Sequence, residues 1–315
     1  MTGHMIQNLS GTITRRAFFS SLAATAVLST FTKAAVAEGE DVWVRRIYIN
    51  CRYGQLHVYT VRPAVPTPHK TPLLFFHQNP KSYIEYKPLL LEMGKDRLVM
   101  AMDTPGYGGS DRPDEVPDMS DLAGAMADAL DVLAYGDKGA GNVDVFGFHT
   151  GAFIASELAV SRPDLVRRVV LSGVAYMTHE ERAQRFAEIP RDMVIPEDGT
   201  MVMRRWHNVV TLRDPSIPIE RAAEIFLDDI KSLNKYWYAY NAVWTYPVEE
   251  RFELLSQPVL LLQPHEMLLQ NTRNVKRDLL PDATLIEIPG VTRNVFDTGT
   301  AEFAEHLRAW LDNKV

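Results

Sequence analysis

After about residue 43, apolar residues fall in short runs that alternate with amphipathic stretches. The run Leu73–Phe76 is apolar throughout, as is typical of a strand buried on both faces, and Tyr53-Gly54 predicts a hairpin turn. Strands are predicted at 44–49, 55–61, 73–76, 97–102, 143–146, 166–171, 258–262 and 284–288. Helices are predicted at 83–93, 119–134, 150–161 and 300–311. This alternation predicts an α/β fold with a doubly wound, mostly parallel sheet.

Between the sixth and seventh predicted strands the alternation stops. Residues 176–251 are charged, helix-like and interrupted by prolines. The segment ends in aromatic residues, namely Tyr236, Trp237, Tyr238, Tyr240, Trp244 and Tyr246. A helical insert at this place predicts a lid over the carboxyl ends of the strands, where ligands bind in such sheets. We expect Trp237 and Trp244 to contact a ligand, the alternative being that the aromatic side chains only pack the lid onto the body. The predicted core is then 38–175 with 252–315.

The N-terminal segment has the features of an export signal. Arg15 and Arg16 precede an uncharged stretch rich in Ala, Ser and Thr, and small residues fill 34–37. This resembles a twin-arginine signal peptide, residues 1–37, cleaved after Ala37. A disordered tail or an uncleaved anchor is the alternative. We expect a periplasmic or secreted mature protein without stable membrane insertion, because the apolar run is too short for a good span.

Composition narrows the classes of partner. Of the 315 residues, 46% are hydrophobic and 23% charged, as in an ordinary globular protein. The net charge of −7 gives no electrostatic reason to expect nucleic acid. A single cysteine, Cys51, excludes an internal disulfide and a Cys-based zinc site. The expected partner is a small molecule, with no cofactor, and a homo-oligomer is compatible with the sequence.

Three motifs follow three of the predicted strands. They are His-Gln-Asn-Pro at 77–80, a glycine-rich segment from Asp103 to Pro113, and Gly-Phe-His-Thr-Gly at 147–151. Their order and spacing resemble the α/β-hydrolase superfamily, especially the branch of epoxide hydrolases, haloalkane dehalogenases and related lid-bearing esterases. The resemblance extends over the chain after about residue 43 and implies an α/β-hydrolase fold with a helical lid.

The resemblance implies that the first motif forms an oxyanion loop. The backbone N–H of Asn79 and that of Thr150 would donate to a developing negative charge. His77 and Gln78 are expected beside them in the substrate-binding region. Because Gln78 stands where the family has glycine, the loop is expected to be stiffer or partly blocked. The turn after Asp103 is interpreted as mostly structural.

The third motif carries histidine where the family has a serine or aspartate nucleophile. Gly147 and Gly151 are retained, and histidine tolerates left-handed backbone angles, so the sharp turn is expected to form. Because a helix N-terminus disfavours a cation, His149 is expected to be neutral. A neutral imidazole can act as a base, a nucleophile or a metal ligand. An inert substitution is the alternative.

The other two triad positions are also changed. Met267 falls closest to the place of the family's acid, with Glu266 one residue away, and Arg293 takes the place of its histidine. Arginine cannot act as a base near neutral pH, so a Ser-His-Asp relay is absent. We interpret Glu266 as orienting an imidazole, and Arg293 as binding a substrate carboxylate or stabilising negative charge.

Two classes of function fit these residues. The first is a hydrolase acting on a small, partly apolar ester, lactone or related carbonyl compound through His149. The second is a non-catalytic relative that binds a small molecule under the lid. The enzyme is favoured, because imidazole is reactive where an inert replacement would be alanine or glycine. A metal site formed by His149, His77 and His265 is a further alternative that the prediction does not adopt.

Overall fold

The computed structural model describes residues 41–65, 70–137, 139–189, 191 and 195–313. The predicted signal peptide at 1–37 lies outside the described residues. Within the described part, no helix combines the length and the apolar character that crossing a membrane requires.

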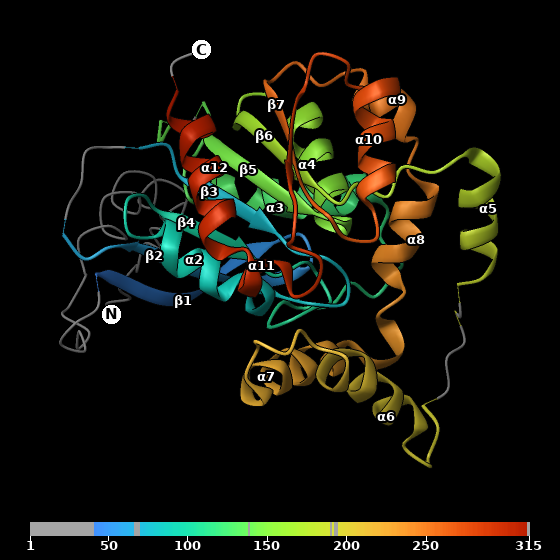
Figure 1. The fold of residues 1–315 in the computed structure, drawn as a ribbon. Helices are drawn as coiled ribbons and strands as arrows, with labels where there is room; N and C mark the ends of the chain where they lie inside the picture. Colours follow the sequence, from blue (N-terminus) through green and yellow to red (C-terminus); the bar gives the residue numbers. More distant parts are fainter. Residues whose placement is uncertain (1–40, 66–69, 138, 190, 192–194, 314–315) are drawn as a thin grey trace, which may run out of the picture. The chain divides into compact units, whose positions relative to one another are not determined.

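The described residues form one eight-stranded sheet with the order β1-β2-β4-β3-β5-β6-β7-β8 (Figure 1). The strands are β1 Val42–Cys51, β2 Gly54–Pro63, β3 Leu73–Phe76, β4 Val99–Met102, β5 Val143–Phe148, β6 Val166–Ser172, β7 Val259–Pro264 and β8 Thr284–Ile288. β2 pairs antiparallel with β1 and with β4, and the remaining neighbours are parallel. The mostly parallel sheet and the first hairpin, both predicted from the sequence, are confirmed.

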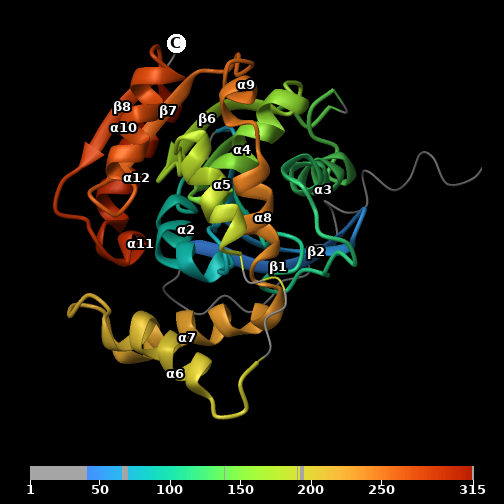
Figure 2. The same ribbon diagram turned by 90° about the vertical axis from the view of Figure 1, so that its right-hand side faces the viewer.

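Helices cover both faces of this sheet (Figures 1 and 2). They are α2 Lys87–Met93, α3 Met119–Val132, α4 Thr150–Ser161, α10 Leu269–Asp278, α11 Val295–Thr298 and α12 Thr300–Asp312. Leu74 and Phe76 of β3 pack into the core that contains α3, α4 and α10, whereas Leu73 and Phe75 pack into the core that contains α2, α11 and α12. Successive side chains of a strand point to opposite faces, so an entirely apolar β3 serves both cores.

Two predicted helices have different bounds in the structure. The segment predicted as one helix over 83–93 is a 3-10 turn, η1 Tyr83–Tyr86, followed by α2. Pro88 lies in the first turn of α2, where its missing N–H costs no hydrogen bond. The helix predicted over 119–134 ends at Val132, because Ala134 has a left-handed backbone with φ 63°.

The insert between β6 and β7 is helical, as predicted. It contains α5 His179–Ala187, α6 Thr200–Trp206, the π-helical turn η2 His207–Thr211, α7 Ile219–Asp229, the 3-10 segment η3 Ile230–Lys235, α8 Tyr238–Thr245 and α9 Val248–Phe252. Tyr107, in the loop after β4, donates its hydroxyl to the carbonyl of Tyr236 at 2.9 Å and accepts the N–H of Ala239 at 3.0 Å. The insert therefore contacts a loop at the carboxyl ends of the strands.

Candidate active site

His149 lies on a sharp turn between β5 and α4, with φ 51° and ψ −115°. Such a backbone costs about 1–3 kcal/mol for a residue other than glycine, and strain of this kind gathers at functional sites. Both glycines of the motif are needed for the turn. A Cβ added to Gly147 would lie 2.2 Å from the carbonyl oxygen of Gly151, and one added to Gly151 would lie 1.9 Å from that of Phe76. The predicted elbow is therefore present in the structure.

The imidazole of His149 contacts the carboxylate of Glu266. Nε2 lies 3.2 Å from Oε2, and the two side chains are 18% and 7% exposed. The ring also lies against Gly173, where an added Cβ would approach Cδ2 of His149 to 2.3 Å and Nε2 to 2.7 Å. The ring of Phe148 packs against the imidazole at 4.0 Å between centroids, with the two planes tilted by 32°. The imidazole is thus held between a carboxylate, a glycine and an aromatic ring.

Glu266 is itself held by hydrogen bonds. Its Oε1 accepts from Nε2 of Gln263 at 2.9 Å and from the N–H of Leu268 at 3.0 Å. Burial alone would raise the pKa of Glu266, but the hydrogen bond and charge of His149, together with these donors, outweigh burial and lower it. Glu266 is therefore a carboxylate at neutral pH.

This contact sets the tautomer of a neutral His149. A carboxylate only accepts hydrogen bonds, so Nε2 carries the hydrogen and Nδ1 keeps the lone pair. Among the described residues no hydrogen bond engages Nδ1. The pair therefore presents one imidazole nitrogen that is able to accept a proton.

The elbow packs directly on the loop that carries the first motif. The Cβ position of Gly151 lies against the carbonyl oxygens of Phe76 and His77, so the N-terminus of α4 adjoins the end of β3. Asn79 and Thr150 are both 6% exposed. Neither of their N–H groups takes part in the backbone hydrogen bonds of the described turns and loops. Both donors of the expected oxyanion site remain available.

The side chains of His77 and Gln78 are occupied by protein partners. His77 donates from Nδ1 to the carbonyl of Gln78 at 2.8 Å, and its Nε2 accepts the N–H of Thr104 at 2.8 Å. Burial lowers the pKa of His77, so the ring is neutral. Gln78 donates from both its backbone and its side chain to Glu85. These two residues fix the loop, and their direct contact with substrate stays a prediction.

Asn79 links the loop to the lid. Its Nδ2 donates to the carbonyl of Tyr236 at 2.5 Å, and its own carbonyl accepts from the hydroxyl of Tyr240 at 3.3 Å. Trp237 is 7% exposed and packs with Ile189 and Tyr238. The indole N–H of Trp237 is buried without a partner among the described residues.

Trp244 packs against this lid cluster and also against the core that contains α4. Packing is thus the observed role of both tryptophans. Their contact with a ligand stays a prediction.

Arg293 is not joined to the His149–Glu266 pair by any hydrogen bond or ion pair of the described residues. It is exposed, and its guanidinium donates to the carbonyl of Asn208 in η2 at 2.9 Å. The neighbouring Asn294 accepts the N–H of Asp214 at 3.0 Å, so this turn is tied to the insert. The expected carboxylate-binding role of Arg293 stays a prediction.

The metal alternative is not assembled. His265 pairs with Glu287 at 3.0 Å, and both ring nitrogens of His77 bind backbone. Within the described ranges, no group of three or more His, Cys, Asp or Glu side chains is arranged to hold a metal ion.

Gln263 is a residue that the sequence reasoning missed. It is fully buried at the end of β7, accepts the N–H of Gly173 at 2.7 Å and donates to Glu266. It therefore connects the glycine beneath the imidazole to the acid beside it. A polar residue ending an otherwise apolar strand was the signal that could have revealed it.

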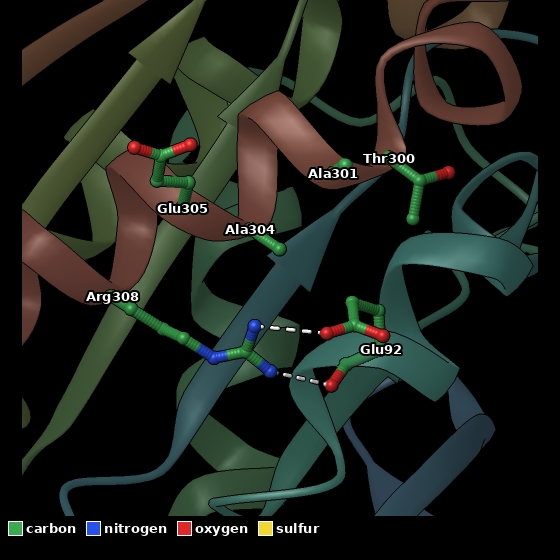
Figure 3. Close-up of a pocket in the computed structure, with 6 residues that line it drawn as sticks. All are labelled: Glu92, Thr300, Ala301, Ala304, Glu305 and Arg308. Atoms are coloured by element: carbon green, nitrogen blue, oxygen red, sulfur yellow. Dashed lines mark hydrogen bonds and ion pairs between the residues drawn. The ribbon is translucent and has the colours of Figure 1, made fainter.

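A separate groove of about 530 Å³ lies between α2 and α12 (Figure 3). Its lining residues are Glu92, Thr300, Ala301, Ala304, Glu305 and Arg308. Arg308 forms an ion pair with Glu92 at 2.9 Å. Glu92 lies near the end of α2 that leads into the amino end of β4, and the groove contains no residue of the three motifs. It is distinct from the candidate active site.

Comparisons with known proteins agree with this fold. A model described as "Alpha/beta hydrolase family" matches residues 73–306. The poly(3-hydroxyalkanoate) depolymerase of Ectopseudomonas oleovorans is 27% identical over 207 residues, which are 64% of this chain and 69% of the depolymerase. The (E)-2-((N-methylformamido)methylene)succinate hydrolase of Acinetobacter baylyi is 27% identical over 175 residues, which are 54% of this chain and 62% of that hydrolase.

Among solved structures, the enol-lactonase of Burkholderia xenovorans LB400 has the same fold. It superposes with a TM-score of 0.66 at 16% identity, covering 85% of this chain and 100% of the lactonase. The family match and the two hydrolytic relatives similar in sequence support an enzyme over a non-catalytic binding protein.

Proposed function

Since the chain belongs to the alpha/beta hydrolase family, we propose that it hydrolyses a small, partly apolar ester, lactone or related carbonyl compound, with His149 as the general base. The observation that carries this proposal is the 3.2 Å contact between His149 and Glu266 on a strained elbow. A carboxylate that orients an imidazole is the arrangement by which hydrolases hold a base in its working tautomer.

The proposed reaction uses one water molecule. Nδ1 of His149 takes a proton from water as the oxygen attacks the carbonyl carbon, and the carbonyl oxygen becomes an oxyanion. The N–H groups of Asn79 and Thr150 donate to that oxyanion. When the intermediate collapses, the bond to the leaving oxygen breaks and Nδ1 returns the proton to that oxygen. Glu266 stabilises the imidazolium that exists between the two transfers.

General-base catalysis is favoured over attack by the imidazole itself. The less hindered nitrogen, Nε2, faces Glu266, which leaves Nδ1, the nitrogen next to the carbon that bears the side chain. Proton transfer tolerates this crowding better than formation of an acyl–nitrogen bond. The acyl-imidazole route remains the alternative, and it is distinguished by a transient acyl adduct on His149.

The substrate class rests on the site and on the relatives. The names of the similar proteins contain a hydroxyalkanoate polymer, a succinate derivative and a lactone, all of them carbonyl compounds. Aromatic residues of the insert, Trp237 and Trp244, favour a partly apolar substrate. The Arg15-Arg16 segment supports export and a periplasmic or secreted enzyme.

The test compares wild type, from Glu38 onward, with His149→Ala and with a control, His265→Ala. His265 is a histidine at 32% side-chain exposure whose ring pairs with Glu287. A panel of esters, lactones, epoxides and haloalkanes is assayed for turnover. We expect hydrolysis of an ester or lactone by wild type and by His265→Ala, and none by His149→Ala. Equal turnover in all three proteins would refute His149 as the base.

A further inference from the structure

The second residue of the oxyanion loop has an unusual partner. Gln78, which replaces the family's glycine, donates its backbone N–H to Oε1 of Glu85 at 2.8 Å and its side-chain Nε2 to Oε2 at 2.7 Å. Glu85 lies in η1, seven residues further along the chain. One carboxyl group thus accepts hydrogen bonds from both the backbone and the side chain of Gln78, the residue directly before Asn79.

Glu85 is a buried acid that the proposed reaction does not use. It is 5% exposed. The charged groups facing it are Lys81, from the same loop, and Asp229, from α7 of the insert. Lys81 is itself bound to Asp229 at 3.0 Å. The cation nearest to Glu85 is therefore already paired with another carboxylate, and Glu85 has no ion-pair partner of its own among the described residues.

We propose that Glu85 is a positioning residue for the oxyanion site: it holds Gln78 at two points, which fixes the N–H of Asn79, and its neutral form supports turnover. The inference rests on the hydrolytic function proposed above. A backbone donor placed in advance costs no reorganisation when the oxyanion forms. Where the family has a flexible glycine, this protein has Gln78, and the carboxyl group of Glu85 fixes the loop at that position.

The protonation state of Glu85 matters for the proposed reaction, because Glu85 lies close to the oxyanion donors. A carboxylate one residue from the oxyanion donor would oppose the negative charge that develops there. Burial raises the pKa of Glu85 to about 8, despite Lys81 and the two bonds from Gln78. The neutral acid still accepts the backbone N–H of Gln78. Its O–H can donate to the side-chain amide oxygen of Gln78 once that amide group is rotated by 180°.

The kinetic test uses Glu85→Gln, Glu85→Leu and a matched control, Glu157→Gln. Glu157 is also buried, at 3% exposure, but it binds Arg251 and Tyr246 away from the elbow.

We expect kcat of wild type and of the control to fall above pH 8, approaching tenfold per pH unit. Glu85→Gln should lose this alkaline limb, because its uncharged amide can replace both hydrogen bonds. Glu85→Leu should lose about 10²-fold in kcat, as when an oxyanion donor is removed. An unchanged alkaline limb in Glu85→Gln would overturn the proposal.

A second readout needs no substrate. The amide proton and nitrogen shifts of Gln78, followed by NMR against pH, should titrate with a midpoint near 8 in wild type and stay constant in Glu85→Gln. A Gln78 chemical shift that does not change with pH in wild type would contradict the proposed contact between Gln78 and a titrating Glu85. Retained turnover in His149→Ala would instead refute the proposed function, so the two failures are distinguishable.

Discussion

At the scale of single residues, the site depends on how one imidazole is held. Nε2 of His149 lies 3.2 Å from the carboxylate of Glu266, and this contact orients the imidazole. Gly173 is the surface against which the ring rests, and its φ of 60° admits no ordinary side chain cheaply.

Gly173→Ala should displace the imidazole. The new Cβ would lie 2.3 Å from Cδ2 and 2.7 Å from Nε2 of His149, so the ring must shift and its contact with Glu266 must change. We expect kcat to fall about 10²-fold, as for the loss of a general base, with a stability cost of about 1–2 kcal/mol for the left-handed backbone. Kinetics and chemical denaturation measure the two effects, and an unchanged kcat would show that the ring position does not matter.

Glu266→Gln tests the role of the carboxylate. An amide can bind Nε2 but does not stabilise the imidazolium, so we expect kcat to fall about 10²–10⁴-fold with little change in KM. Because the pKa of Glu266 is lowered on folding, wild type gains stability from this group above pH 4.5 and loses it as pH falls through the folded-state pKa. Glu266→Gln should lack that acid-side loss, which unfolding experiments at several pH values would detect.

At the scale of elements, the loops after β3 and β4 and the segment α7–α8 of the insert form one connected region. Asp228 accepts from Ser82 at 2.6 Å, and the neighbouring Asp229 accepts from Lys81 and from Arg205. The side chain of Asp229 is fully buried. The oxyanion loop is thus anchored to the insert within a few residues of Asn79.

Asp229→Asn should loosen this anchor. The neutral amide cannot balance the positive charges of Lys81 and Arg205. We expect the free energy of unfolding to fall by about 1.5–3 kcal/mol, the contribution of hydrogen bonds to charged groups. KM should rise as the insert separates from the loop. The exposed Asp198, which accepts hydrogen bonds from Thr200 in the same insert, supplies the control Asp198→Asn. Equal stability of the two variants would contradict the anchor.

The strands were predictable because a buried strand appears in the sequence as a short continuous run of apolar residues. Leu73–Phe76 is apolar at every position, and this alone indicated a strand covered on both faces. The elbow was predictable because Gly147 and Gly151 are required within five residues of each other. Glu85 and the partner of Arg293 were not predictable, because each depends on contacts between different elements; Gln263 had a local signal, but its contacts with Gly173 and Glu266 did not follow from it. Glu266 was interpreted from the sequence as orienting an imidazole, and in the structure its side chain contacts Nε2 of His149 at 3.2 Å.

At the scale of the whole molecule, Glu85 links the site to stability. The unfolded chain releases the proton of this acid near pH 4.5, whereas the folded protein keeps it up to about pH 8. The unfolded state therefore binds fewer protons in this window, and stability falls as pH rises, by about 1.4 kcal/mol per pH unit. Glu85→Gln should show a shallower slope between pH 5 and 8. Parallel curves for the two proteins would mean that Glu85 is ionised at neutral pH.

The central claim is that the histidine on the elbow performs the chemistry. Its most direct test is kcat/KM of His149→Ala relative to wild type, on whichever ester or lactone wild type hydrolyses best. We expect a fall of at least about 10²-fold, the usual contribution of a general base, while the thermal stability of the variant stays close to that of wild type, because alanine keeps the Cβ and the two glycines of the elbow are unchanged. A kcat/KM within twofold of wild type would contradict the account.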